Sequence, residues 1–279
     1  MRQRPLERFF LLHLPLCLFL IVTLFPFYWM FITAIKPNAE LYNVRMNPFL
    51  VLKPTLDHFR YLMQETLFLT WAYNTFYVSV LSTAISLLIG IMAGYALARL
   101  RFKGASVMAV GIFVTYLIPP TLLFIPLADV VRALGLLDSP WALILTYPTF
   151  LIPFSTWLLM GYFKTIPREL EECAMIDGAT RFQAMIKIIL PLALPGILSA
   201  GIFAFTLSWN EFIYALVFLP SSDIKTIPVG VVSELIRGDV FVGGPLMAGA
   251  LLGSVPVAII YSFFVEYYIA GLTAGAVKG

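Results

Sequence analysis

Charged residues are scarce in this sequence. Asp, Glu, Lys and Arg make up 12% of the 279 residues, whereas a soluble domain carries about 25%. Hydrophobic residues account for 61% of the chain, and its mean hydropathy is +0.93. These proportions exclude an ordinary soluble domain and predict an integral membrane protein. The net charge of +3 is too small to indicate a nucleic-acid-binding surface.

Cysteine and histidine are nearly absent as well, with two of each. Cys17 lies in the first apolar run and Cys173 lies in a polar segment, so we expect no disulfide between them. His13 and His58 are far apart in the sequence and have no metal-ligating neighbours. We therefore expect no metal site.

Sequence motifs for catalysis are also missing. No G-x-x-x-x-G-K-[ST] phosphate loop occurs, so the chain is not itself an ATPase. No Ser/His/Asp or His-Glu-x-x-His arrangement lies near an apolar run, which gives an intramembrane hydrolase no support. We expect no catalytic residue and no cofactor in this chain.

Six long apolar runs dominate what is present. They span approximately residues 9–35, 72–97, 107–127, 141–163, 197–219 and 246–269. Each has about 20 residues or more, enough to cross a hydrocarbon core of about 30 Å as a helix. A helix is favoured in lipid because it satisfies its own backbone hydrogen bonds. The sequence predicts an all-α membrane protein with six transmembrane helices, the first being a retained anchor rather than a signal peptide.

Proline and glycine predict details within these runs. Pro119 and Pro120 should break the third run, because proline removes a backbone N–H and disfavours helix before it. Gly90 and Gly94 should form a small-residue face for close helix contact in the second run.

The basic residues predict the orientation of these helices. With the N-terminus inside, eleven of the 18 Lys and Arg residues fall in inside segments and seven in outside loops. The short loop that holds Arg99, Arg101 and Lys103 is the strongest single indicator. Both termini are therefore predicted to be cytoplasmic. The outside loops are expected near 36–71, 128–140 and 220–245.

A polar segment at about 167–190 interrupts the oily sequence, and its first half predicts a short helix. Pro167 suits the first helical turn, and Glu169, Glu171 and Glu172 are favourable near a helix N-terminus. Gly178 fits a left-handed residue that ends this helix.

The second half of the segment predicts another helix. Thr180 and Gln183 form a capping-box pattern. A continuous apolar stripe follows at helical spacing, formed by Phe182, Met185, Ile186, Ile189 and Leu190. Pro191 and Pro195 should then bend the chain where it re-enters the bilayer. The residues alone leave two interpretations open: a hairpin that only connects two spans, or one that docks against another protein.

A resemblance favours docking. Glu172-Cys173-Ala174, Gly178, Ile188 and Leu190-Pro191 fit the pattern E-A-A-x3-G-x9-I-x-L-P. This pattern resembles the signature loop of bacterial ABC importer permeases, with Cys173 where that family usually has Ala. The resemblance implies a type I ABC importer permease fold, in which the hairpin docks in a cleft of the cytoplasmic ATPase. The implied ATPase-coupling residues are Glu171, Glu172, Cys173, Ala174, Asp177 and Gly178, with charge from Glu171 and Glu172 offered to basic groups of the ATPase.

Three further stretches, "FTLSWNEFIYAL", "KTIPVGV" and "YYIAGLTAGAVKG", resemble permeases of carbohydrate importers, in particular the shorter permease of maltose transporters. This implies import of a sugar, such as a disaccharide, an oligosaccharide, a related glycoside or a glycerol-phosphate compound. It also implies a multi-pass location in a bacterial inner membrane. The implied partners are a second homologous permease, two ATPase subunits that carry ATP and Mg, and an external solute-binding protein. The implied organisation is an anchor helix and external loop (1–70), a permease core (71–270) and a cytoplasmic tail (271–279).

Trp209, Asn210 and Glu211 lie inside the fifth apolar run. An intramembrane carboxylate is costly and marks a functional site by default, so we expect these residues on the translocation path or at a gate. A structural hydrogen bond from Glu211 to a neighbouring helix is the alternative. Two other functions stay open on the residues alone: a proton-coupled secondary carrier that uses Glu211, and a membrane scaffold without transport.

Overall fold

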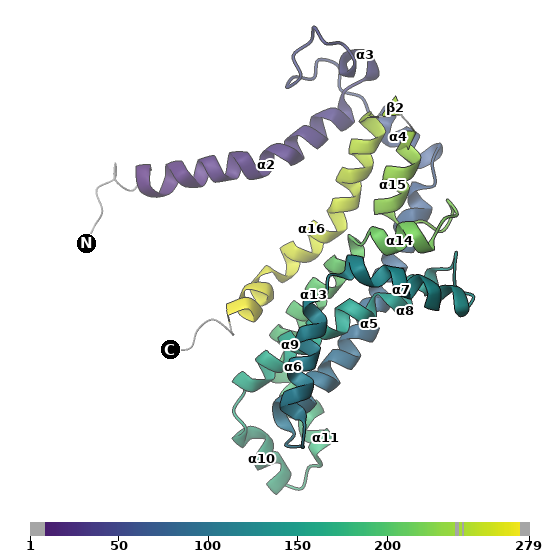
Figure 1. Ribbon diagram of the computed structural model, residues 1–279. Coiled ribbons are helices and arrows are strands. Elements are labelled where there is room, and N and C mark those ends of the chain that lie inside the picture. The colour runs from purple at the N-terminus through teal and green to yellow at the C-terminus, as the bar shows by residue number, and fades with distance from the viewer. Residues whose placement is uncertain (1–8, 238–239, 242, 274–279) are drawn as a thin grey trace. The chain divides into compact units, whose positions relative to one another are not determined.

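The computed structural model describes residues 9–237, 240–241 and 243–273, whose regular secondary structure is helical apart from one pair of two-residue strands (Figure 1). The chain forms two compact units, one of Met1–Leu69 with Gly230–Val255 and one of Thr70–Val229 with Pro256–Gly279. The N-terminal arginines and Lys278, which entered the predicted orientation, lie outside the described residues. So does most of the predicted tail.

The first unit holds the predicted anchor and external loop. Its elements are η1 (Phe9–His13), α2 (Leu14–Ile35), α3 (Asn38–Leu41), α4 (Asp57–Gln64), much of α15 (Ile227–Leu235), the strands β1 (Ile236–Arg237) and β2 (Val240–Phe241), and the first part of α16 (Gly243–Thr273). The strands are antiparallel, with Ile236 opposite Phe241.

The loop after α2 is folded around a buried carboxylate. Glu40 accepts hydrogen bonds from the backbone N–H groups of Leu52 (3.0 Å) and Lys53 (2.9 Å). The buried ring of His58 lies 2.8 Å, through Nε2, from the carbonyl oxygen of Lys36. Buried polar groups require such partners. The predicted outside loop is therefore an ordered structure.

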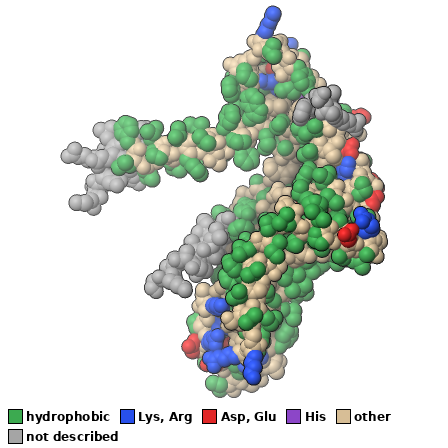
Figure 2. Space-filling model, viewed as in Figure 1, with side chains coloured by type: hydrophobic (Ala, Val, Ile, Leu, Met, Phe, Trp, Pro, Cys, Tyr) green, Lys and Arg blue, Asp and Glu red, His purple; other side chains and the backbone are tan. Residues whose placement is uncertain are grey.

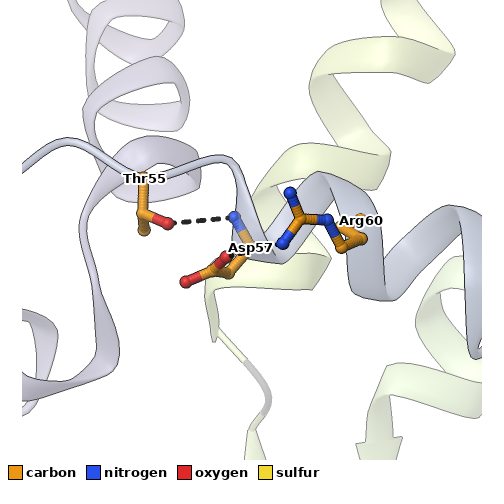
Figure 3. A network of polar contacts seen from close by, with 3 residues as sticks. All are labelled: Thr55, Asp57 and Arg60. Carbon is orange, nitrogen blue, oxygen red and sulfur yellow. Dashed lines mark hydrogen bonds and ion pairs between the residues drawn. The ribbon is translucent and has the colours of Figure 1, made fainter.

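Polar contacts also shape the start of α4. The hydroxyl of Thr55 accepts the backbone N–H of Asp57 at 3.1 Å, and Arg60 lies 3.5 Å from the Asp57 carboxylate one turn later (Figure 3). Both charged side chains are largely exposed. Such a pair contributes little to stability, so we assign it only a local role in starting the helix.

The second unit contains the remaining helices. They are α5 (Phe68–Arg99), α6 (Ala105–Leu117), α7 (Pro120–Ala133), α8 (Pro140–Thr146), α9 (Pro148–Thr165), α10 (Glu169–Ile176), α11 (Arg181–Ala184), η2 (Met185–Ile189), α12 (Leu190–Leu192), α13 (Leu194–Trp209) and α14 (Ile213–Phe218). Within this unit, α10 and α11 lie at one end, and α7, α8 and α14 lie toward the other (Figure 1).

Four of the six predicted spans are present as helices long and apolar enough to cross a membrane. They cover Phe10–Ile35, Phe68–Arg99, Pro140–Thr165 and Gly243–Glu266. The other two predicted spans are not single helices: α6 and α7 meet at 95°, and the helical segment 181–192 meets α13 at 76°. The number of candidate spans in the described residues is six only if each bent pair counts as one.

The prolines explain both bends. Ile118 and Pro119 have extended backbone, with ψ angles of 122° and 126°, because a residue before proline avoids the helical region. This confirms the predicted break at Pro119 and Pro120. The bend at Ala193 falls between Pro191 and Pro195, also as predicted. The fifth run, however, was predicted as one helix over 197–219 and instead stops at Trp209.

Helix α5 packs closely on α9 through its glycines. A Cβ atom on Gly90 would lie 2.8 Å from the Cβ of Ser155, and one on Gly94 would lie 3.1 Å from the backbone nitrogen of Met160. Both distances are too short for a larger residue without movement. The predicted small-residue face is therefore confirmed, and it fixes α5 against the helix that leads into the hairpin.

Candidate functional sites

The hairpin, residues 167–192, turns at Gly178. This residue has a φ of +90°, as predicted. The N–H of Ala179 donates to the carbonyl of Ala174 at 3.0 Å, and the N–H of Gly178 donates to the carbonyl of Met175 at 3.2 Å. These two bonds form a Schellman motif, which satisfies the last carbonyls of α10. The turn geometry is thus set by the glycine.

The capping box at the second helix is present as well. The Thr180 hydroxyl accepts the N–H of Gln183 at 3.2 Å, and the Gln183 side chain accepts the N–H of Thr180 at 2.8 Å. The helix that follows is not regular, because residues 185–189 form a π-helical turn. The predicted continuous stripe is therefore wrong: Met185 and Ile189 are buried, whereas the other apolar positions of the stripe are at least partly exposed.

The inner face of the hairpin is tied to the ends of α5 and α9. Glu171 is only 5% exposed, and its carboxylate accepts the hydroxyl hydrogen of Tyr95 on α5. Arg99 donates to the carbonyl of Ile166 at 2.7 Å, and Arg168 donates to the carbonyl of Ala98 at 3.2 Å. Met185 and Ile189 pack in the same apolar cluster as Tyr95 and Ile166. These contacts fasten the hairpin to α5 and pack it against the end of α9.

This placement departs from the prediction for Glu171. The sequence alone suggested that its charge faces the ATPase together with that of Glu172. In the structure Glu171 points inward, and Ala174 is also buried, at 8% exposure. The reason is the helical period, since residues three apart lie on one face. Glu172, Cys173, Asp177 and Gly178 are exposed.

The outer face of the hairpin carries exposed apolar side chains. Ile176 is 84% exposed and Phe182 is 62% exposed, and the other large ones are Leu170 and Ile186. Large apolar side chains that are exposed together, where they form a patch, mark an interaction site or a lipid-facing surface. Together with the exposed Glu172 and Asp177, they give the hairpin a mixed apolar and acidic face.

The second candidate site is the break after α13. One carboxylate oxygen of Glu211 accepts the N–H of Tyr214 at 2.9 Å, and the other accepts the N–H of Ala215 at 3.1 Å and the hydroxyl of Tyr147 at 2.9 Å. The first turn of a helix has such unpaired donors and favours a negative charge. Glu211 therefore caps α14. The hydrogen bond from Tyr147, at the junction of α8 and α9, also matches the predicted alternative in which Glu211 bonds to a neighbouring helix.

Tyr214 joins the two broken spans. Its hydroxyl donates to the carbonyl of Pro120 at 3.0 Å, at the break between α6 and α7. The side chains of Trp209 and Asn210, which were predicted to belong to the same site, contact other residues. Trp209 is buried and stacks on Phe205 with a centroid distance of 5.4 Å, and the Asn210 amide donates back to the carbonyl of Thr206 at 2.9 Å. A role for Trp209, Asn210 and Glu211 in translocation stays a prediction.

Sequence reasoning missed the two tyrosines that hold these carboxylates. Tyr95 and Tyr147 lie within apolar runs of a chain with 15% aromatic residues, so nothing in the composition singled them out. A polar tip on an apolar ring generally needs a partner when buried. That rule is the only way in which the sequence could have indicated that Tyr95 and Tyr147 are hydrogen-bonded, and it does not identify the glutamates as their partners.

The match to known families decides what these two sites belong to. The family of binding-protein-dependent transport system inner membrane components matches residues 86–273, which include both the hairpin and the Glu211 break. The chain belongs to this family. It is thus a permease subunit of a bacterial ABC importer, a multi-pass inner membrane protein and a transport component.

Similar proteins agree with this assignment over nearly the whole permease. It is 40% identical over 257 residues, or 92% of its length and 89% of the relative's, to the sulfoquinovosyl glycerol transport system permease protein of Agrobacterium fabrum. It is 33% identical to the trehalose/maltose transport system permease protein of Thermococcus litoralis, over all of both chains. A chain in the crystal structure of a bacterial ABC transporter for the acidic polysaccharide alginate has the same fold, with a TM-score of 0.82, 23% identity, and 96% and 99% of the two chains covered.

Proposed function

We propose that this permease moves a sugar or glycoside across the inner membrane by alternating access, driven by ATP hydrolysis on a separate ATPase subunit. Relatives named for transport of sulfoquinovosyl glycerol, trehalose/maltose and diacetylchitobiose support the substrate class. ATP and Mg would bind on the partner. A second homologous permease, two ATPase subunits and an external solute-binding protein complete the proposed transporter.

The observation that carries the proposal is the two-faced hairpin. Its inner face is hydrogen-bonded to α5 through Tyr95 and packs in the apolar cluster that contains Ile166 after α9, and Arg99 bonds the end of α5 to Ile166. Its outer face presents Ile176, Phe182 and Glu172 to a partner. A rigid element that is held by two spans and exposed on its other face can transmit a conformational change of the ATPase to the membrane helices.

The membrane arrangement is part of the proposal. Six crossings require that each bent pair span the bilayer, with the hairpin on the cytoplasmic side. The basic residues Arg99, Arg101, Arg168 and Arg181 lie at the hairpin end of the second unit, which fits the positive-inside rule. Both termini are then cytoplasmic.

Reconstitution tests the function. The complete transporter, with its second permease and ATPase, is placed in liposomes together with the loaded binding protein. We expect uptake of a sugar that requires ATP and the binding protein. A screen of sugars for binding to that external protein identifies the substrate. Uptake driven by a pH gradient without ATP would overturn the proposal and favour the proton-coupled carrier.

The structure favours the importer over that carrier. A proton site needs a carboxylate that can lose its partners as it takes up a proton. Both oxygens of Glu211 instead hold the start of α14 through the N–H groups of Tyr214 and Ala215. In the proposal, Glu211 keeps its charge and holds the first turn of α14 in place after the break in the fifth span.

A further inference from the structure

A cavity opens between the hairpin and the end of α5. Its volume is about 470 Å³, within the usual range for small-ligand sites. It is lined by Arg99, Leu100, Arg101, Arg168, Glu171, Glu172, Met175 and Arg181. Figure 2 shows basic side chains gathered at this end of the second unit. Four guanidinium groups against two carboxylates leave a surplus of two positive charges.

Arg99 marks this cavity as more than a solvated surface. Its side chain is buried, with 6% exposure, and one of its nitrogens donates to Ile166. Its Nε atom makes no hydrogen bond in the described part of the chain. A buried guanidinium that forms no ion pair in the described residues is costly, and an anion in the cavity would offset its charge. Glu171 does not fill this role, because no ion pair joins it to Arg99 and it accepts the hydroxyl of Tyr95.

The position of the cavity indicates which anion. Arg99 is the last residue of the candidate span Phe68–Arg99, and Ile166 directly follows the candidate span Pro140–Thr165. The cavity therefore lies where two spans leave the membrane, at the level of the lipid headgroups. Basic pockets between membrane helices at this level bind phosphate-bearing headgroups, and guanidinium groups match phosphate oxygens in pairs.

We propose that this arginine-lined cavity binds a phosphate-bearing ligand that carries two negative charges in total. The source is either an anionic phospholipid headgroup, such as the paired phosphodiesters of a dimeric lipid, or a soluble phosphomonoester. Leu100 and Met175 supply the apolar side of the cavity. Because Arg168 and Arg181 belong to the hairpin and Arg99 ends α5, a phosphate bound between them would fix the hairpin against α5 and tune its coupling to the ATPase.

Two arginines permit a test without unfolding the hairpin. No hydrogen bond or ion pair of the Arg101 or Arg181 side chain is found in the described residues, so Arg101→Gln/Arg181→Gln removes charge from the cavity and no structural contact. Arg132→Gln is the control, since Arg132 is exposed and, among the residues that the structure describes, its side chain pairs only with Asp129, at 3.1 Å. The purified full-length permease is titrated with vesicles of zwitterionic lipid that do or do not contain a dimeric anionic lipid, and separately with glycerol phosphate.

The expected result is binding of anionic vesicles or of glycerol phosphate by the wild type and by Arg132→Gln, weakened at least about tenfold in the double variant. Binding of the anionic vesicles that glycerol phosphate does not displace assigns the lipid source, and displacement assigns the soluble one. Equal binding by the double variant and the wild type would overturn the proposal. So would loss of ATPase association by the double variant in detergent without anionic lipid, because the cavity would then receive an acidic segment of the ATPase.

Discussion

Tyr95 of α5 donates its hydroxyl hydrogen to the buried carboxylate of Glu171, and this bond fastens the first helix of the hairpin to a membrane span. Residue 171 is separated from residue 95 by four other helices of the second unit and their connections. The bond therefore closes a long path through the permease. It makes the hairpin a continuation of the membrane domain rather than a loose connector.

The Tyr95–Glu171 bond predicts a sharp contrast between adjacent glutamates. Glu171→Ala leaves the Tyr95 hydroxyl without its partner, which costs ~1–3 kcal/mol, and should loosen the hairpin. Glu172→Ala removes an exposed charge and should alter ATPase binding by ~1 kcal/mol or less. Limited proteolysis of the hairpin in the purified permease measures the first effect. Equal protease resistance of Glu171→Ala and Glu172→Ala would contradict the assigned role of Glu171.

Gly178 gives a second prediction, because its φ is +90°. A side chain in this conformation costs about 1–2 kcal/mol, and more when β-branched. Gly178→Val should therefore reduce ATPase association and the stimulation of ATP hydrolysis by the loaded binding protein, while membrane insertion is kept. Gly178→Asn should be milder, since Asn tolerates this region. Gly161→Ala is the control, because a Cβ there meets nothing within 4 Å and needs no positive φ. Normal coupling in Gly178→Val would reduce the hairpin to a connector.

Glu211 gives a third prediction through the helix it caps. Glu211→Gln can still accept one backbone N–H but loses the charge that favours the start of α14. We expect impaired transport with retained assembly, because the hairpin and its contacts are untouched. Tyr147→Phe removes the hydroxyl donor alone and should have the same direction of effect. Uptake and co-purification with the ATPase are measured together; loss of assembly in Glu211→Gln would show that the break is needed for folding instead.

The fourth prediction concerns the orientation. Cys17 and Cys173 are both exposed, so Cys17→Ser/Cys173→Ala provides a background without thiols. In it, Ser222→Cys should react with an impermeant thiol reagent added outside intact cells, and Ser106→Cys should not. Both positions are exposed, so accessibility from the medium decides the outcome. The reversed labelling pattern would place the hairpin outside and remove its proposed partner.

Local rules on the sequence predicted the hairpin turn well. The positive φ of Gly178 and the capping box of Thr180 and Gln183 depend on residues at most five positions apart, and both are present. The break at Pro119 and Pro120 is equally local. The close face of Gly90 and Gly94 also follows from one helix alone, because small residues permit contact whatever lies opposite.

Features that depend on distant partners were not predictable in this way. The inward direction of Glu171 is set by Tyr95, and the start of α14 after the break is stabilised by Glu211, which Tyr147 holds. Both partners are single tyrosines in apolar runs without a distinguishing pattern. The π-helical turn at 185–189 likewise escapes a rule based on regular helical spacing, so the stripe was assigned to one face when the structure divides it between two.

Contact between the outer face of the hairpin and the ATPase is the central claim, and cross-linking through Cys173 tests it most directly. Cys173 is exposed on α10. In a permease with Cys17→Ser, a short bifunctional thiol reagent should join Cys173 to a cysteine placed in the permease-facing cleft of the co-purified ATPase. A matched permease with Cys17→Ser, Cys173→Ala and Ser222→Cys should give no such product. A cross-link from position 222 but not from Cys173, in a complex that assembles and hydrolyses ATP, would contradict the account.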